Sequence, residues 1–370
     1  MGGGIAGASA AYALAKTEVF DRVVLLEAED QLAQHTTGRS AAMLTENYGE
    51  GPVRPLTAAS LDFLHNPPDA LVDNSLLHPR GVMTVATSRE GYESLDTMLA
   101  EGRAATHPIG EIDVDHAQRL APHIRFTSDH RAMWEEHAYD IDVAALHQAF
   151  VRGLRAHGGE IATSHRVDAV RPAAEGWSLE TTAGSVPADL VVNAAGAWGD
   201  VVAQRAGIEP VGLQPLRRTA FMVKSPYVDS AEYPFVVDSH HSWYLRPDGS
   251  QFMCSPADET PSEPCDARAE EIDIARTIDA INENTTLDIR SITSRWAGLR
   301  TFGPDRSMVI GPDPGQPTFV WCVGQGGTGI QTAPGAGQLI ADLLRNERPG
   351  PTFDGTGLQL EQLLPDRLRT

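Results

Sequence analysis

The chain has 370 residues, in which 50 aspartate and glutamate residues outnumber 29 lysine and arginine residues, so its formal net charge is −21. This length suits two domains, or one large domain, with an ample hydrophobic core. The negative charge argues against nucleic acid and anionic membrane surfaces as partners, and no apolar run is long enough to span a bilayer.

No signal peptide precedes the first motif, and the three cysteines have neither metal-binding nor redox spacing. We therefore expect a cytoplasmic protein with reduced thiols and no metal site.

The first thirty residues carry a dinucleotide-binding pattern. A run of helix-forming residues from Ala6 to Lys16 and an apolar strand from Val23 to Leu26 follow a glycine-rich turn, and Glu27 ends the strand twenty residues after the last glycine. This is where the fold places the acid that binds a ribose hydroxyl, while the helix N-terminus faces the diphosphate. The alternative is a glycine turn that serves packing alone. The glycines of the G-x-G-x-x-G pattern are Gly2, Gly4 and Gly7.

A complete unit of this kind has an apolar strand before the first glycine, whereas this chain begins at Met1. The neighbouring strands would lose a hydrogen-bonding partner without it. We expect that the natural protein carries further residues upstream. The alternative is a working protein without that strand, or a flavin-free, inactive scaffold.

The next elements alternate between helices and strands. A loop of small and hydroxyl residues, His35–Ala42, could follow a phosphate or a flavin ring. Helices are predicted over 52–66, 89–102, 115–120 and 143–157, and strands over 81–87 and 132–137. Short strands follow near 160–163, 166–171, 177–181 and 185–187, and an apolar strand then runs into Ala194-Ala-Gly196.

The second half begins with a long predicted strand, 211–224, and antiparallel strands at 235–237, 242–246 and 251–254. An acidic loop, 256–264, and a helix over 267–282 follow. Further strands are predicted at 290–299, 307–311 and 318–323, before a glycine-rich turn, Gly324–Thr332, that opens a helix over 333–345.

Glycine-rich strand-to-helix turns at both ends of the chain favour one extended ligand bound between distant segments. Free amides at Gly326–Gly329 suit an electron-rich carbonyl or a negatively charged ring. A purely structural turn is the alternative. Together the two ends favour a flavin dinucleotide over a nicotinamide one.

Several motifs are similar to those of the D-amino acid oxidase superfamily of FAD enzymes, which includes glycine and sarcosine oxidases. They are Gly2-Gly-Gly-Ile-Ala-Gly7, Asn193-Ala-Ala-Gly-Ala-Trp198, Ala297-Gly-Leu-Arg300 and Gly329-Ile-Gln-Thr332. Within the superfamily the chain most resembles the bacterial D-arginine dehydrogenases, over nearly its whole length. The resemblance implies an α/β fold of the glycine oxidase type, with a Rossmann-like FAD-binding domain that lacks its first strand and a mixed-sheet α+β substrate domain. We expect residues 1–47, 138–212 and 292–370 in the FAD-binding domain, and 48–137 and 213–291 in the substrate domain.

The resemblance also implies which residues hold the substrate carboxylate. These are Arg218, Tyr244 and Arg300, together with the loop tyrosine Tyr48. A guanidinium can grip a carboxylate through two hydrogen bonds and so fix Cα over the flavin. The alternative for each arginine is a structural ion pair, and Arg217 would replace Arg218 if the strand presented its other face.

The remaining site predictions concern the cofactor and the side-chain pocket. The cofactor-binding residues predicted besides the three glycines are Ile5, Ala6, Glu27, Ala28, Thr36, Thr37, Gly38, Arg39, Ser40, Ala41, Ala42, Val167, Ala195, Gly196, Trp198, Gly326, Gly327, Thr328, Gly329, Ile330 and Gln331. The predicted side-chain pocket consists of Met43, Thr45, Val82, Phe235, Val237 and His241.

Two departures from the family pattern affect substrate and cofactor. The relatives hold a guanidinium substrate with a histidine and a glutamate where this chain has Met43 and Val82, so a cationic substrate is not expected. Sarcosine oxidases link FAD to a cysteine just beyond the Gly-Leu-Arg arginine, whereas this chain has Thr301-Phe302-Gly303. We therefore expect non-covalent FAD.

The resemblance implies oxidative deamination of a small-molecule D-amino acid, with hydride transfer from Cα to flavin N5 and hydrolysis of the imino acid to a 2-oxo acid and ammonia. The electron acceptor is not identified by the sequence. The alternative on the same fold is a glycine- or sarcosine-type amine oxidase.

Overall fold

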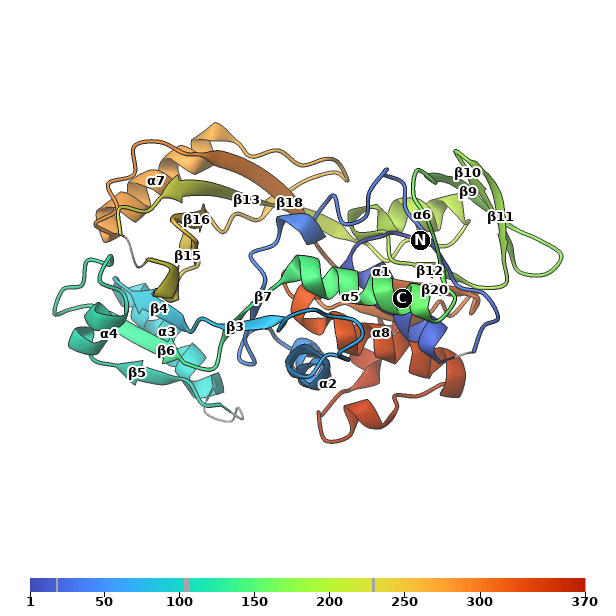
Figure 1. The fold of residues 1–370 in the computed structure, drawn as a ribbon, viewed down its shortest axis with the longest axis horizontal. Coiled ribbons are helices and arrows are strands. Elements are labelled where there is room, and N and C mark those ends of the chain that lie inside the picture. Colours follow the sequence, from blue (N-terminus) through green and yellow to red (C-terminus); the bar gives the residue numbers. More distant parts are fainter. Residues whose placement is uncertain (18, 103–106, 228–229, 370) are drawn as a thin grey trace.

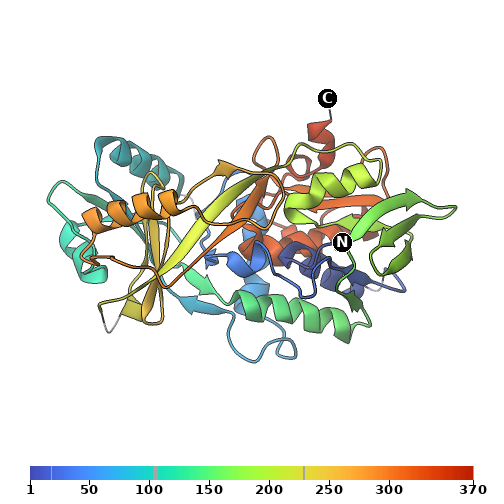
Figure 2. The ribbon, with the colours of Figure 1, turned by 90° about the horizontal axis from the view of Figure 1, so that it is seen from above.

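The computed structural model describes residues 1–17, 19–102, 107–227 and 230–369. Figures 1 and 2 show two lobes, and the long strands β13 (Gln214–Lys224) and β18 (Ser294–Phe302) run side by side from one lobe to the other. We call the lobe that holds α1 (Ile5–Lys16) the first lobe, and the lobe that holds α7 (Glu271–Asn284) the second lobe.

Small residues let the helices of the first lobe approach closely. Helix α1 packs against α8 (Gly329–Asn346) and α5 (Val143–Ala156). A Cβ atom on Gly337 of α8 would lie 2.6 Å from the Ser9 carbonyl oxygen of α1, so only glycine allows this approach. Helix α2 (Val53–His65) packs on α8, where the Ser60 hydroxyl accepts a hydrogen bond from the Gly335 amide (2.9 Å).

The strands of the first lobe form short sheets. Strand β1 (Val24–Leu26) pairs in parallel with β8 (Glu160–Ala162). Strand β20 (Phe319–Val323) pairs in parallel with β12 (Val191–Asn193) and antiparallel with β19 (Val309–Pro312). A meander of β9 (Val167–Pro172), β10 (Trp177–Thr181) and β11 (Gly184–Ala188) lies at the edge, next to α6 (Gly199–Arg205).

Strands β1 and β12 belong to separate sheets in the described part of the chain. The first two residues bridge the two strands instead. The Gly2 amide donates to the Leu26 carbonyl (2.8 Å), and the Met1 carbonyl accepts from the Ala194 amide (2.9 Å). A cavity of about 120 Å³, lined by residues that include Leu25 and Val192, lies beside this bridge.

A mixed nine-stranded sheet dominates the second lobe. Its strand order is β17-β13-β16-β15-β14-β4-β6-β5, with β18 paired to β13. Only β14 and β4 pair in parallel among these strands as described. The remaining strands are β17 (Thr260–Pro261), β16 (Gln251–Ser255), β15 (Tyr244–Asp248), β14 (Phe235–Asp238), β4 (Val82–Ala86), β6 (Arg131–Glu135) and β5 (Gly110–Ile112).

Side-chain alternation gives this sheet two different faces. Phe221, Leu245, Phe252 and Cys254 are fully buried on one face, and α7 and α4 (Val114–Leu120) cover it. The opposite face carries Ala220, Met222, Val237, Tyr244 and Met253. Helix α3 (Arg89–Gly102) packs on β4 and β6 at the far end of the sheet.

Smaller elements complete the fold. A three-stranded sheet of β2 (Met43–Leu44), β7 (Tyr139–Ile141) and β3 (Leu77–Pro79) lies near the junction of the lobes. No helix in the described ranges is long and apolar enough to cross a membrane. Short 3-10 helices occur at Thr37–Arg39, Gly196–Trp198, Ser230–Glu232, Pro351–Phe353, Leu360–Gln362 and Pro365–Leu368.

The α/β fold class is confirmed, but some predicted boundaries are wrong. Helix α8 begins at Gly329, four residues before the predicted start, and contains Pro334 in its second turn. Helix α7 begins at Glu271 instead of Ala267, because Ala267 is buried against β18 and its carbonyl accepts from Arg39. Strand β18 is Ser294–Phe302, later than the predicted 290–299. The division into five domain segments remains a prediction.

Candidate active site

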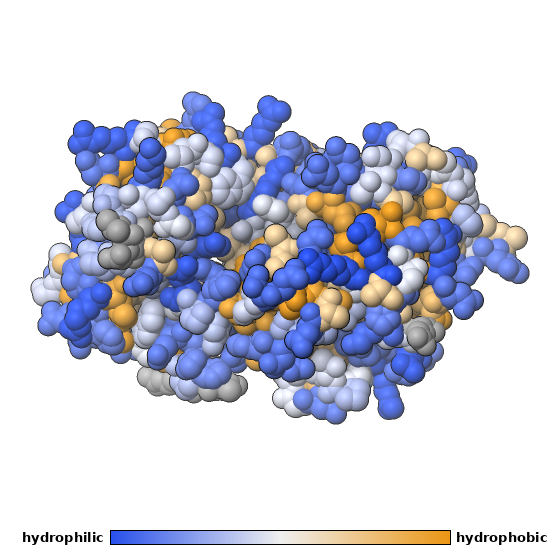
Figure 3. Space-filling model, viewed as in Figure 1, coloured by the Kyte–Doolittle hydropathy of each residue, from blue (hydrophilic) through white to orange (hydrophobic). Residues whose placement is uncertain are grey.

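One cavity of about 360 Å³, which we call the main cavity, runs from the N-terminal glycine turn to the junction of the lobes. Its walls come from segments far apart in sequence, chiefly 1–6, 26–41, 165–167, 194–205, 298–301 and 325–330. Arg218, Ala220, Tyr244 and Met253 from the large sheet also line it. Hydrophobic residues are exposed on the face of the molecule where the N-terminus lies (Figure 3).

The glycine turn has the geometry that its spacing predicts. Gly2 has a φ of 102°, and a Cβ atom there would lie 2.3 Å from the Ala194 carbonyl oxygen. A Cβ atom on Gly7 would lie 1.8 Å from the Gly2 oxygen. Gly7 therefore serves the close packing of helix on turn, and it does not line the main cavity.

The N-terminus of α1 leaves backbone amides for a ligand. The Gly3 amide donates to Glu27 Oε2 (2.6 Å), and the Ile5 amide donates to Thr37 Oγ1 (3.0 Å). The amides of Gly4 and Ala6 make no hydrogen bond with the described residues, and no side chain caps the helix. Free amides at the positive end of a helix dipole fit a diphosphate.

Glu27 lies in the wall beside these amides. Its second oxygen, Oε1, accepts from the Glu29 amide (2.9 Å), so two backbone groups orient the carboxylate. Each oxygen retains a lone pair, and the carboxylate can therefore accept a ribose hydroxyl.

The loop 35–42 ties the nucleotide end to the large sheet. The Thr36 hydroxyl donates to the Leu299 carbonyl (2.8 Å), Arg39 Nη1 donates to the Ala297 carbonyl (2.7 Å), and Trp296 Nε1 donates to the Arg39 carbonyl (3.1 Å). The loop is thereby fixed against β18.

The second glycine-rich turn packs against the side chains of Phe302 and Arg300. Gly326 has a φ of 53°, and a Cβ atom there would lie 2.3 Å from the Phe302 ring. A Cβ atom on Gly327 would lie 2.9 Å from Nη1 of Arg300. The guanidinium of Arg300 therefore lies directly against the glycine backbone at the cavity wall.

Strand register places Arg218 and Arg300 together. Leu216 pairs with Arg300, and Arg218 pairs with Gly298, so the two arginines are diagonal neighbours on one face of the sheet. Such neighbours have Cα atoms about 7–8 Å apart. Arg217 lies on the opposite face because successive side chains alternate.

The two arginines differ in their partners. Arg300 is half-buried, and its guanidinium makes no hydrogen bond or ion pair with another described residue. Arg218 Nε donates to the Asp258 carbonyl (2.8 Å), and its Nη2 lies 3.3 Å from Glu259 Oε1. Burial and the neighbouring Arg300 guanidinium lower the pKa of Arg218, but guanidinium stays protonated at neutral pH.

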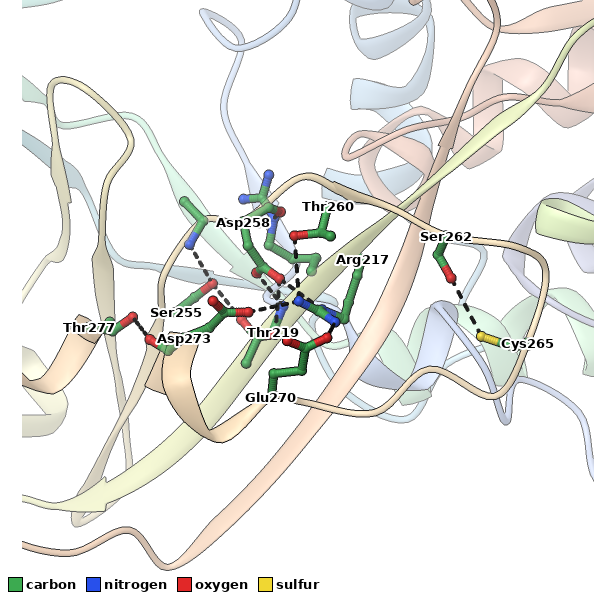
Figure 4. A network of polar contacts seen from close by, with 12 residues as sticks. Arg217, Thr219, Ser255, Asp258, Thr260, Ser262, Cys265, Glu270, Asp273 and Thr277 are labelled. Carbon is green, nitrogen blue, oxygen red and sulfur yellow. Dashed lines mark hydrogen bonds and ion pairs between the residues drawn. The ribbon is translucent and has the colours of Figure 1, made fainter. Parts of the chain in front are cut away.

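Arg217 belongs to a structural ion cluster (Figure 4). Its guanidinium contacts the carboxylates of Asp258, Glu270 and Asp273, the last at 2.8 Å. Asp258 also accepts from the Thr219 amide (2.6 Å). This cluster fixes the loop after β16 and the start of α7 to β13.

None of the six predicted substrate-pocket residues lines the main cavity, and four of them lie close to residues that do. Val82, Phe235 and Val237 pack with Tyr244 in one apolar cluster, and the Phe235 and Tyr244 rings stack with centroids 5.2 Å apart. His241 lies within electrostatic range of Arg218 and has a left-handed backbone, with φ 54°.

Met43 and Thr45 lie in and next to strand β2. Met43 pairs with Asp140 in β7, and the Thr45 amide donates to Gln331 Oε1 (3.2 Å). Tyr48 is 45% exposed and lies within electrostatic range of Arg218.

Four further cofactor predictions do not line the main cavity in the described structure. The Gly38 amide donates to the Ala33 carbonyl (3.0 Å) within the loop. The Gln331 side chain donates to the Thr57 hydroxyl (2.9 Å), which joins α8 to α2. The other two are Ala42 and Thr328.

Sequence reasoning missed residues that support the cavity. His147 of α5 is buried, and its Nε2 lies 2.9 Å from the Gly3 carbonyl oxygen, so the ring holds the glycine turn. The Thr301 hydroxyl is buried at the cavity wall without a hydrogen-bond partner among the described residues. Neither residue belongs to a recognisable motif, and no sequence signal identifies them.

A glycine turn with free helix amides, an acid in the cavity wall beside them and arginines at the other end fit a dinucleotide-dependent oxidoreductase. The family model described as "FAD dependent oxidoreductase" (DAO) matches residues 1–343, so the chain belongs to the DAO family and is FAD-dependent. The free amides, Glu27 and the extended cavity fit that cofactor.

The chain is similar to known members of this family. It is 23% identical to glycine oxidase of Geobacillus kaustophilus, over 96% of this chain and 93% of that protein. It is 24% identical to mitochondrial dimethylglycine dehydrogenase of Mus musculus, over 94% of this chain but only 42% of that protein. The fold superposes on the crystal structure of G. kaustophilus glycine oxidase with a TM-score of 0.82 and 22% identity, over 98% of this chain and 96% of that one. L-proline dehydrogenase from P. horikoshii gives a TM-score of 0.82 at 18% identity, over 99% and 96%.

Proposed function

We propose that this FAD-dependent amine oxidoreductase oxidises a D-amino acid to an imino acid, which water hydrolyses to a 2-oxo acid and ammonia. The observation that carries the proposal is Arg300. A half-buried guanidinium without a protein partner is unfavourable unless a ligand supplies the anion, and this one lines the main cavity.

In this proposal the chain's residues position the substrate. Arg300 and Arg218 bind the carboxylate on one face of the sheet, and the buried Tyr244 supplies a hydroxyl beside them. Tyr48 covers the site from its exposed loop. FAD, when bound, supplies the acceptor for the hydride that leaves Cα.

A second candidate function is oxidation of glycine or an N-methylated glycine. It is favoured by similarity to glycine oxidase, dimethylglycine dehydrogenase and human mitochondrial sarcosine dehydrogenase (24% identical over 96% of this chain). Phe302, in the position of the linking cysteine of sarcosine oxidases, counts against the sarcosine branch, and a substrate panel separates glycine from a D-amino acid.

We further propose that the substrate side chain is neutral. The carboxylates near the pocket are already engaged, since Glu46 pairs with His107 (2.8 Å) and Asp238 accepts from the Ser242 hydroxyl (2.6 Å). Glu135 lies opposite Val82 in the β4–β6 register, and burial raises its pKa to about 7. A preference for D-arginine would implicate Glu135 as its partner.

We also propose a cytoplasmic setting. Cys254 and Cys322 are free, and burial raises the pKa of each thiol, to about 12 for Cys322. Such inert, reduced thiols are in keeping with the cytoplasm. The acceptor is left to experiment.

A substrate panel tests the proposed function. The FAD-loaded protein is assayed with D-Met, D-Leu, D-Phe, D-Arg, D-Lys, glycine and sarcosine, using an artificial acceptor in parallel with oxygen. We expect the neutral D-amino acids to give the highest kcat/KM. A preference for glycine or sarcosine would support the second candidate, and a tenfold preference for D-Arg would contradict the neutral pocket.

A further inference from the structure

Glu259 approaches Arg218 from outside the main cavity. It lies in the acidic loop after β16, next to β17, which pairs with β13 at Leu216 and Arg217. Its Oε1 is 3.3 Å from Arg218 Nη2, and it does not line the main cavity. Arg218 itself does, so its guanidinium lies between the carboxylate and the substrate site.

A second arginine holds Glu259 in place. Arg306 Nη2 donates to both carboxylate oxygens of Glu259, each at 3.0 Å. The Arg306 guanidinium stacks on the Phe302 ring, 4.1 Å from its centroid, and that ring packs on Gly326. Glu259 is thus fixed to the same turn that carries the cavity wall.

This arrangement sets the charge that faces a ligand. Arg218 and Arg300 would together present two positive charges on one face of the sheet. Glu259 offsets part of the charge on Arg218, because its carboxylate also pairs with Arg306, whereas Arg300 has no acidic partner among the described residues. Across a half-buried site of low dielectric, an uncompensated charge strongly affects which anions bind.

We propose that Glu259 is a specificity-determining residue that restricts the substrate to one carboxylate group. By offsetting part of the Arg218 charge from outside the main cavity, it leaves Arg300 as the guanidinium without an acidic partner among the described residues, which matches the single α-carboxylate of an amino acid. A dicarboxylic amino acid would then bring a second charge without a partner. The inference rests on the proposed function, in which Arg300 binds the α-carboxylate.

Isosteric ligand pairs test the proposal. Succinate and succinamate differ by one carboxylate, and their binding to the FAD-loaded protein is followed by the change in flavin absorbance. We expect Glu259→Gln to raise the affinity for succinate relative to succinamate by about tenfold or more. The kcat/KM ratio of D-Glu to D-Gln should rise in the same direction. Glu259→Ala should change both ratios in the same direction. Using two substitutions guards against a folding defect that is specific to one of them.

Glu263→Gln is the matched control. Glu263 is an exposed acid of the same loop whose side chain makes no contact with the described residues, so its loss changes net charge alone. The ligand ratio should be unchanged in this variant. A ratio within twofold of wild type in both Glu259 variants, or an equal rise in Glu263→Gln, would overturn the proposal.

Arg300→Ala distinguishes a failure of the specificity proposal from a failure of the proposed function. If it weakens succinamate binding while the Glu259 variants leave the ratio unchanged, the specificity proposal fails and the proposed function stands. If succinamate binds equally well without Arg300, the proposed function fails, and the inference from Glu259 fails with it.

Discussion

Arg300→Ala should abolish most of the turnover and leave the fold intact. The side chain has no ion pair or hydrogen bond with the described residues, so its removal orphans no carboxylate. Loss of a charge-assisted, two-point grip on a carboxylate costs about 3 kcal/mol, which corresponds to roughly a 150-fold fall in kcat/KM. Arg300→Lys should recover only part of this loss, because an ammonium cannot reproduce the planar fork.

The assay compares steady-state kinetics, flavin absorbance and thermal midpoint in the wild type and the three variants Arg300→Ala, Arg300→Lys and Arg217→Ala. Arg217→Ala is the contrasting variant, since it breaks the cluster with Asp258, Glu270 and Asp273 on the other face. It should destabilise the fold, on the order of 2 kcal/mol, and affect kcat/KM less than Arg300→Ala does. Wild-type kcat/KM in Arg300→Ala, or a larger catalytic defect in Arg217→Ala, would refute the assignment of the strand face.

Three other predictions concern cofactor and stability. Glu27→Ala should weaken FAD binding by about 1–3 kcal/mol, measured by fluorescence titration of the apoprotein; unchanged affinity would contradict the ribose contact. Acid precipitation should release all flavin colour into the supernatant, because Phe302 offers no sulfur for a covalent link, and a coloured pellet would contradict this. His123 is fully buried, neither ring nitrogen has a hydrogen-bond partner among the described residues, and burial lowers its pKa from 6.5 to about 3. The unfolded chain therefore binds the extra proton below pH 6.5, so stability should fall as the pH drops toward 3, by about 2 kcal/mol at pH 5. Urea unfolding of His123→Phe should show a shallower pH dependence, and identical slopes would argue against His123 as the cause.

Local patterns predicted the cofactor end of the molecule well. The turn at Gly2 and Gly7, the helix after it and the acid at Glu27 depend on neighbours in sequence, and their spacing is enough to define them. Membership of an FAD-dependent family is confirmed. The predicted start of α8 was four residues late, because the helix begins within the glycine-rich turn at Gly329, and Pro334 lies inside it next to the Gly335–Ser60 contact with α2.

The substrate end depends on pairing between distant strands, which alternation in one strand cannot reveal. Nothing in the sequence states that Arg218 pairs with Gly298, or that Glu259 reaches Arg218. The supporting contact of His147 with Gly3 spans 144 residues and has no motif. The roles assigned to individual site residues remain predictions for the experiments above.

The ladder between β13 and β18 also constrains how the molecule can move. Its pairs run without a shift from Gln214–Phe302 to Met222–Ser294, across the junction of the lobes. A hinge there would have to break consecutive backbone hydrogen bonds, so the lobes cannot close around a ligand as two jaws. We therefore expect entry and release to depend on loops such as the one that carries Tyr48, and viscosity or loop-shortening effects on kcat would report such a gate. The same ladder sets the register that places Arg218 and Arg300 on one face of the sheet.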